Sequence, residues 1–135
     1  MEAQNRTQEL EALLNGRSIL DLAGEEAAMA VELLTQVVKS KSLESFTEVE
    51  YKALIEELAK DLAINMFKAD LPADWKRQAL HKIENSNERK GGWSFASILD
   101  EYLNGVEMWD ALDADDAEKV AKAIMDYLEV EGGDL

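Results

Sequence analysis

Side chains suited to acid–base or nucleophilic chemistry are scarce in this sequence, which has one histidine, His81, and no cysteine. A Ser-His-acid or Cys-His site needs a base that titrates near neutral pH, and no histidine other than His81 can supply it. No Gly-x-Ser-x-Gly segment presents a nucleophilic serine. Because His81 falls near the end of a short predicted helix, we interpret it as a surface or capping residue. We therefore predict no catalytic residues and a protein that is not an enzyme.

Paired carboxylates are the one alternative source of catalysis. Glu57 and Asp61 lie four positions apart, which places them one turn apart on a helix. Such a pair could provide a carboxylate base for proton transfer. Solvated helix faces carry similar pairs routinely, so an enzyme of this kind is our third hypothesis.

Metal ligands are equally sparse. Structural zinc sites need cysteine or several histidines. Di-iron bundles use Glu-x-x-His pairs, whereas this chain has the reverse order in His81-x-x-Glu84. The acidic stretch 110–118 does not match a calcium-binding loop, because the sixth position counted from Asp113 is Glu118 rather than glycine. We predict neither a metal nor a cofactor.

The charge distribution bears on partners. The 135 residues carry a net charge of −15, divided into −8 over residues 1–75, +3 over 76–99 and −10 over 100–135. An acidic surface repels the phosphates of nucleic acids, so we predict no nucleic-acid binding. Lys90-Gly91-Gly92 indicates a phosphate loop only weakly, since the established spacing of such loops is missing. The charge favours a basic partner, or serves to keep the protein in solution.

Our first hypothesis is a non-enzymatic acidic helical protein that acts through protein–protein interaction, as a regulator, adaptor or inhibitor of a basic partner. Interface hot spots are rich in Trp, Tyr and Arg, and such residues gather in the C-terminal half. The candidate partner-binding residues are Arg77, Arg89, Lys90, Trp93, Tyr102 and Trp109. Two alternatives stay open: the aromatic residues belong to the core, or the basic segment and the acidic C-terminal region pair within one molecule or across a homodimer.

The second hypothesis is a small-molecule-binding helical domain with an apolar pocket between helices. The residues that would line this pocket are Met29, Met66, Phe67, Trp93 and Trp109. Clefts lined by apolar and aromatic side chains are the usual form of such sites.

Helical periodicity dominates the elements that must position these residues, and no strand pattern competes. We predict an all-α, compact, single-domain bundle of six or seven helices, three of them long. The long helices are expected over 25–39, from Glu48 to about Lys68, and along the C-terminal segment after Asp115. Shorter helices are expected over 3–15, over 73–84 and after Ser94, with brief helical turns over 18–22 and 106–112.

Local features predict where these helices start and stop. Thr47 and Glu50 have the spacing of a capping box, in which each residue's side chain bonds to the other's backbone N–H. The helix that follows is apolar on more than one side, so we expect it at the centre of the fold. Asp115 is the predicted cap of the last helix. Residues 85–92, rich in Asn, Ser and Gly, are interpreted as a connection between two helices.

Processing and membrane patterns are missing from the sequence. No apolar run approaches the roughly 18 residues that a membrane span requires, and the N-terminus lacks the pattern of a signal peptide. We expect a cytoplasmic protein of bacterial or phage origin that makes no membrane contact. Residues 1–135 are expected to form one domain, with a frayed tail after about residue 130.

One segment is locally similar to a known family. Residues 42–58, SLESFTEVEYKALIEEL, resemble a helix start in the colicin immunity proteins, which are small acidic helical inhibitors. The shared feature is the capping box. The paired tyrosines with which that family contacts nucleases have no counterpart here, so no residue role is carried over. The resemblance implies only that a chain of this size and charge suits an inhibitor.

Overall fold

The computed structural model describes the backbone of residues 2–67, 73–89 and 95–132, and the side chains of 6–66, 73–85 and 95–129. These residues form seven α-helices and two short 3₁₀ turns, without any strand. The elements are α1 (Glu2–Leu14), η1 (Ile19–Asp21), α2 (Gly24–Ser40), η2 (Leu43–Ser45), α3 (Glu48–Phe67), α4 (Trp75–Arg89), α5 (Phe95–Leu103), α6 (Glu107–Asp110) and α7 (Ala114–Gly132). The predicted all-α class, the number of helices and the three long ones, α2, α3 and α7, are confirmed.

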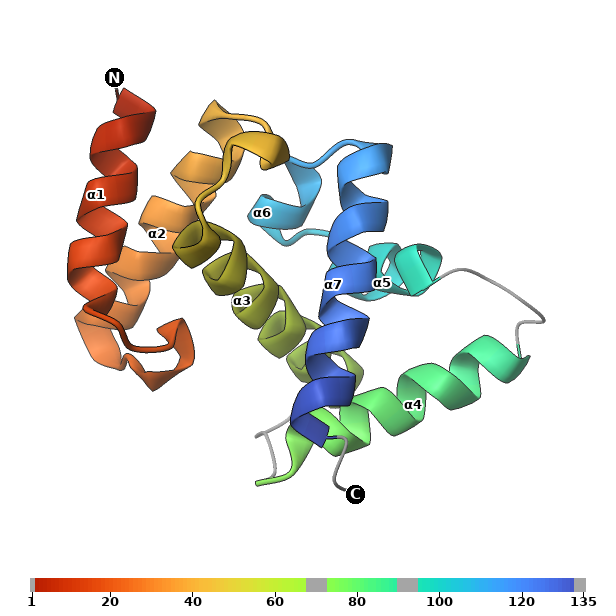
Figure 1. Cartoon of the computed structure of the whole chain (residues 1–135). Helices are drawn as coiled ribbons and strands as arrows, with labels where there is room; N and C mark the ends of the chain where they lie inside the picture. The colour runs from red at the N-terminus through yellow and green to blue at the C-terminus, as the bar shows by residue number, and fades with distance from the viewer. Residues whose placement is uncertain (1, 68–72, 90–94, 133–135) are drawn as a thin grey trace.

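Helix α3 runs through the middle of the molecule (Figure 1). Helix α2 lies on one side of it with α1 packed on the outside, and α7 packs on the other side together with α5. The short α6 contacts α2, and α4 crosses the far ends of α3 and α7. Every side chain from Ala53 to Ala59 in α3 is buried, which confirms the central place predicted for this helix.

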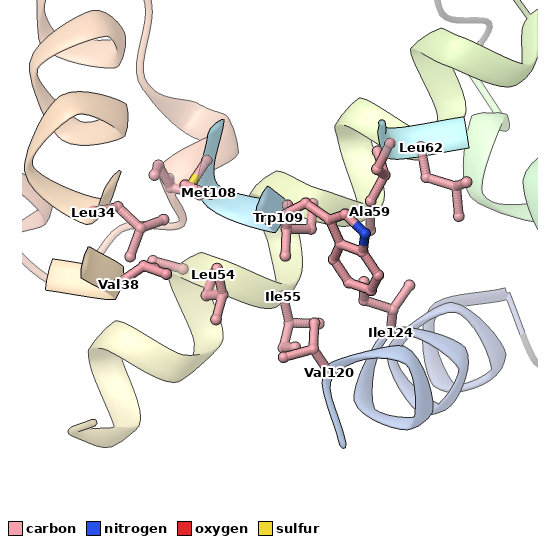
Figure 2. Close-up of a cluster of buried hydrophobic side chains, with 14 of the residues drawn as sticks. Leu34, Val38, Leu54, Ile55, Ala59, Leu62, Met108, Trp109, Val120 and Ile124 are labelled. Carbon is pink, nitrogen blue, oxygen red and sulfur yellow. The ribbon is translucent and has the colours of Figure 1, made fainter. Parts of the chain in front are cut away.

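The core joins α2, α3, α6 and α7 around the indole of Trp109. Figure 2 shows this ring between Ala59 of α3 and Ile124 of α7. Trp109 is only 4% exposed, and its indole N–H donates to a carboxylate oxygen of Asp100 at 3.1 Å. A buried tryptophan needs such an acceptor for its single donor. Trp109 is therefore a core residue, as one of our alternatives held, and its ring is not available as a surface contact.

Two predicted boundaries are wrong. Helix α4 continues to Arg89, so residues 85–89 are helical rather than part of a connection. The high content of Asn and Ser suggested a loop, but these residues lower helix propensity only slightly and do not by themselves end a helix. The rest of the expected connection, and the predicted cap Ser94, lie outside the described residues.

The cap of α7 lies two residues earlier than predicted. An Asp113 carboxylate oxygen accepts from the backbone N–H of Asp116 at 2.9 Å, and the Asp113 carbonyl accepts from Ala117. Asp115 instead occupies the first turn, where its negative charge suits the helix dipole. Several aspartates in succession offered more than one register for the same cap.

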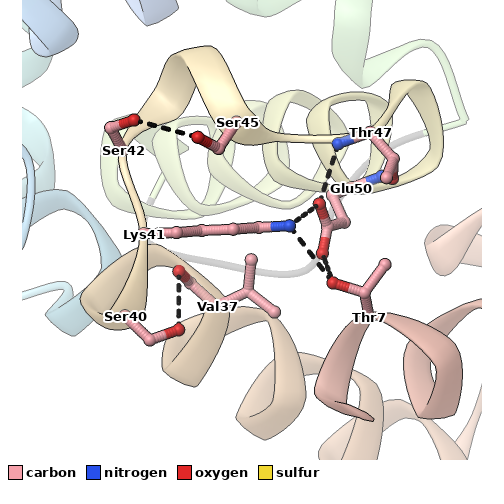
Figure 3. A network of polar contacts seen from close by, with 8 residues as sticks. All are labelled: Thr7, Val37, Ser40, Lys41, Ser42, Ser45, Thr47 and Glu50. Carbon is pink, nitrogen blue, oxygen red and sulfur yellow. Dashed lines mark hydrogen bonds and ion pairs between the residues drawn. The ribbon is translucent and has the colours of Figure 1, made fainter. Parts of the chain in front are cut away.

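The predicted capping box at the start of α3 is confirmed. The Thr47 backbone N–H donates to Glu50 at 2.8 Å, and the Glu50 backbone N–H donates to the Thr47 hydroxyl at 3.1 Å. Glu50 is also fully buried, which the sequence pattern did not indicate. Lys41 approaches its carboxylate at 2.6 Å, and the Thr7 hydroxyl donates to its other oxygen (Figure 3).

This network sets the charge state of Glu50. Burial opposes ionisation, but bonds from Lys41, Thr7 and the Thr47 backbone outweigh it and lower the pKa of Glu50 below 4.5. Lys41 follows α2 and Thr7 belongs to α1, so one carboxylate joins three helical segments. Because the folded-state pKa is lowered, Glu50 contributes stability above its ordinary pKa, and this stability is lost as the pH falls through the folded-state value.

Lys41→Met is expected to lower the free energy of unfolding at pH 7 by about 3 kcal/mol, because it leaves a buried carboxylate without its cation. The deficit relative to wild type should shrink at acidic pH, because the buried Glu50 carboxyl takes up a proton more readily once the Lys41 cation is removed. Urea denaturation at both pH values measures this, with the exposed Lys52→Met as a control. An equal loss at pH 7 and pH 3.5 would contradict the assignment.

Candidate functional site

A groove of about 720 Å³ lies between α2 and α3, and η1 and α6 each contribute one residue to its lining. Its volume falls in the range typical of small-molecule sites. Four residues of the lining, from η1 and the first half of α2, are apolar, and the others carry hydroxyl, amide or charged side chains. The lining residues are Ile19, Ala27, Ala28, Val31, Glu32, Thr35, Gln36, Lys39, Glu57, Lys60 and Glu107.

The buried carboxylates of α3 differ in how they are satisfied. Glu50 has the network of Lys41 and Thr7, and Glu56 accepts a hydrogen bond from the Ser18 hydroxyl at 2.9 Å. Glu57 is only 7% exposed and lines the groove, yet no hydrogen bond or ion pair joins its carboxyl to the described residues. The Glu57 side chain is thus largely buried, while its carboxyl oxygens reach the solvent of the groove and are free to accept from a bound molecule.

The environment of Glu57 disfavours its charged form. Burial raises the pKa of Glu57 to about 7, the neighbouring carboxylate of Asp61 adds to the shift, and Lys60 opposes it. Burial also raises the pKa of Asp61 to about 6, against the opposing charge of Lys60. Strongly perturbed carboxyls in a cleft are typical of functional sites. Asp61 itself is not among the groove-lining residues.

Gln36 is the second unsatisfied group of the groove. Its side-chain oxygen is buried and accepts no hydrogen bond from the described residues. The adjacent Thr35 hydroxyl donates to the Val31 carbonyl at 2.8 Å, so its proton is already used. At the rim, Lys39 forms an ion pair with Glu107 of α6. The groove therefore offers two acceptors without donors, and a ligand that supplies N–H or O–H groups would satisfy them.

The described members of the predicted apolar pocket, Met29, Met66 and Trp109, do not line a common pocket. Trp109 and Met66 are buried in the hydrophobic core, whereas Met29 is 54% exposed on α2. The side chain of Phe67 and all of Trp93 lie outside the described residues. None of the described members of this set lines the α2–α3 groove, because helical periodicity places side chains on a face without indicating which faces leave a gap.

The predicted partner-binding residues are not gathered on one surface within the described residues. Arg77 is exposed and lies 3.9 Å from Asp74, the residue just before α4, and Tyr102 is half-buried against the core. Trp109 is buried. Arg89 is the last residue of α4, with its side chain outside the described set, and Lys90 and Trp93 are not described.

The basic helix α4 packs on the acidic helix α7 within the same molecule. The Lys76 ammonium lies 4.4 Å from the ring centre of Tyr127 and 5.8 Å from that of Trp75, distances that give cation–π attraction. His81 is exposed and contacts the Asn85 amide at 3.1 Å, one turn along the helix. One of our alternatives was that the basic segment and the acidic C-terminal region contact each other within one molecule. The packing of α4 on α7 provides such a contact.

Two further grooves, of about 400 and 460 Å³, flank Lys119 and Lys122 on the two sides of α7. Their lining is mainly apolar, with Tyr51 in one and Met125 in the other. Neither contains a buried polar group without a partner, so the α2–α3 groove is the stronger candidate.

The described residues also bear on metal binding and on membrane spans. No three acidic, histidine or cysteine side chains gather closely enough among the described residues to hold a metal ion. None of the helices, over the part of the chain described, combines the length and apolar character needed to cross a bilayer. Comparison with family models, curated proteins and solved structures found no match to this chain.

Glu57→Gln is expected to stabilise the fold. The pKa of Glu57 is raised in the folded state. The contribution of its protonated form to the free energy of unfolding is therefore fully present below pH 4.5 and is lost as the pH rises through 7. The variant should gain up to about 3 kcal/mol at pH 8 and little at pH 5. Urea denaturation across pH 5–8 measures this, with the exposed groove residue Glu32 changed to Gln as control. A pH-independent difference would contradict the assigned burial.

Proposed function

We propose that this protein is a non-enzymatic binding protein that receives a small ligand in the α2–α3 groove. The observation that carries the proposal is Glu57, a buried carboxyl that lines a 720 Å³ groove without a partner in the described residues. An unpaired buried carboxyl destabilises a fold, and such a cost is typical of sites that need the group for binding.

The groove has the composition of a binding site. Ile19, Ala27 and Val31 supply apolar contact area, and Gln36 and Glu57 supply a few acceptors that would orient a ligand. The raised pKa of Glu57 also suits general acid–base catalysis, which was our third hypothesis. Binding is the simpler proposal, because the one hydroxyl among the groove-lining side chains, that of Thr35, donates to a backbone carbonyl and is not oriented as a nucleophile.

Ala28→Trp is expected to abolish ligand binding, because this exposed groove residue can accept a large ring that fills the opening without entering the core. A thermal-shift screen with cationic, neutral and anionic small molecules should give compounds that raise the Tm of wild type but not of Ala28→Trp. The matched control is Ala12→Trp on the exposed face of α1. If no compound separates Ala28→Trp from wild type, ligand binding in the groove is wrong.

A second candidate function is protein–protein interaction with a basic partner, which was our first hypothesis. The observation that favours it is a set of exposed carboxylates on α6 and α7 whose side chains form no ion pair with the described residues. Fields of one sign speed encounter with oppositely charged proteins. The set is Asp110, Asp115, Glu118 and Glu129.

Neutralising these four acids to Asn or Gln is expected to abolish recovery of a basic partner from a lysate of the source organism, compared quantitatively by mass spectrometry. Wild type should recover the partner at low salt and lose it at high salt, because exposed charges are screened. The control neutralises four exposed acids on other helices, which gives a variant with the same net charge. They are Glu9 and Glu11 of α1, Glu25 of α2 and Glu48 of α3. Equal loss in both variants would indicate a general charge effect.

A further inference from the structure

We propose that the ligand of the α2–α3 groove is a small amine, whose protonated nitrogen pairs with Glu57 while a hydrocarbon body lies along the apolar residues of the lining. This inference rests on the proposed function and names the ligand class. It starts from two acceptors of the groove that no described residue bonds: the buried Gln36 side-chain oxygen, and the carboxyl of the largely buried Glu57 side chain, whose oxygens reach the solvent of the groove. Both are acceptors, so the missing partner must bring donors.

An ammonium group meets this requirement better than a neutral donor. It carries up to three N–H groups and a positive charge, and charge-assisted hydrogen bonds are about twice as strong as neutral ones. The same helix shows the effect at Glu50, where the ammonium of Lys41 lies 2.6 Å from a fully buried carboxylate. A ligand amine would give Glu57 the kind of partner that Lys41 gives Glu50.

The charges of the chain's own residues do not supply that partner. Lys60 lies close enough to influence Glu57 electrostatically but forms no ion pair with it, and Lys39 is engaged by Glu107. The other charged groups near Glu57 or on the groove are acidic. They are Glu56 and Asp61 of α3 and Glu32 of α2. An anionic ligand would meet these carboxylates, whereas a cationic ligand is attracted by them.

The remaining surface of the groove suits a hydrocarbon body rather than a second charge. Ile19 of η1 and Ala27, Ala28 and Val31 of α2 line it, and all four side chains are apolar. The volume of about 720 Å³ exceeds what a bare ammonium ion fills. An alkyl or arylalkyl amine therefore fits the groove better than a small inorganic cation.

The test uses three probes of similar shape, 2-phenylethylamine, 2-phenylethanol and 3-phenylpropanoate, with calorimetry and NMR chemical-shift mapping on the full chain at pH 7.5. The amine is expected to bind at least about tenfold more tightly than the alcohol, a difference of about 1.4 kcal/mol. Its shifts should map to Ala28, Val31, Gln36 and Glu57. Glu57→Gln should weaken amine binding at least about tenfold without weakening the alcohol, and we expect it to stay folded because removing the charge favours the buried side chain.

Gln36→Leu provides a second variant and should weaken the amine by a smaller factor. Glu9→Gln, exposed on α1 and outside the groove lining, is the control and should bind like wild type. The inference is overturned if the amine does not bind at millimolar concentration, binds Glu57→Gln equally well, or maps outside the groove. If the alcohol or the carboxylate occupies the groove and the amine does not, the ligand class is wrong while the binding function stands.

Discussion

The fold depends on burying the middle of α3, from Ala53 to Ala59, on all sides, and that burial disfavours any polar side chain there that lacks a partner. Glu50 shows how the requirement is met. Its carboxylate accepts from the capping box, from Lys41 after α2 and from Thr7 of α1, so the peripheral helix α1 is joined to the centre through one buried group. A carboxylate in this position would be costly alone, but satisfied it fixes the relative position of three segments.

Glu57 is also a carboxylate on the buried part of α3, but none of the described residues bonds to it. It lies two turns further along α3, is nearly as buried, and faces a groove rather than a neighbouring donor. The contrast within one helix is what distinguishes a structural carboxylate from a candidate binding residue, because the surrounding fold is demonstrably able to satisfy such groups. Stability given up at Glu57 is consistent with selection for a site, since sites commonly retain unsatisfied groups that a ligand completes.

Residue spacing predicted part of this site and missed the rest. Glu57 and Asp61 were recognisable as a pair one turn apart, but their raised pKa values come mainly from burial, which depends on how other elements pack against α3. Gln36 offered no pattern at all, since one amide among apolar residues resembles any solvated position. The aromatic residues misled in the opposite direction. Trp109 resembled an interface residue by type, yet its ring fills the space between α3 and α7.

The sequence by itself determined the all-α class, the central place of α3 and the capping box at its start, because these follow from periodicity and from bonds between residues three or four positions apart. Tertiary structure alone decided which carboxylates found donors and where a groove remained, because both depend on residues distant in the chain. Thr7 and Glu50 meet across 43 positions, and the groove exists where four separate elements fail to fill the space between them. Local preferences carry no information about such gaps, since a gap is a property of packing.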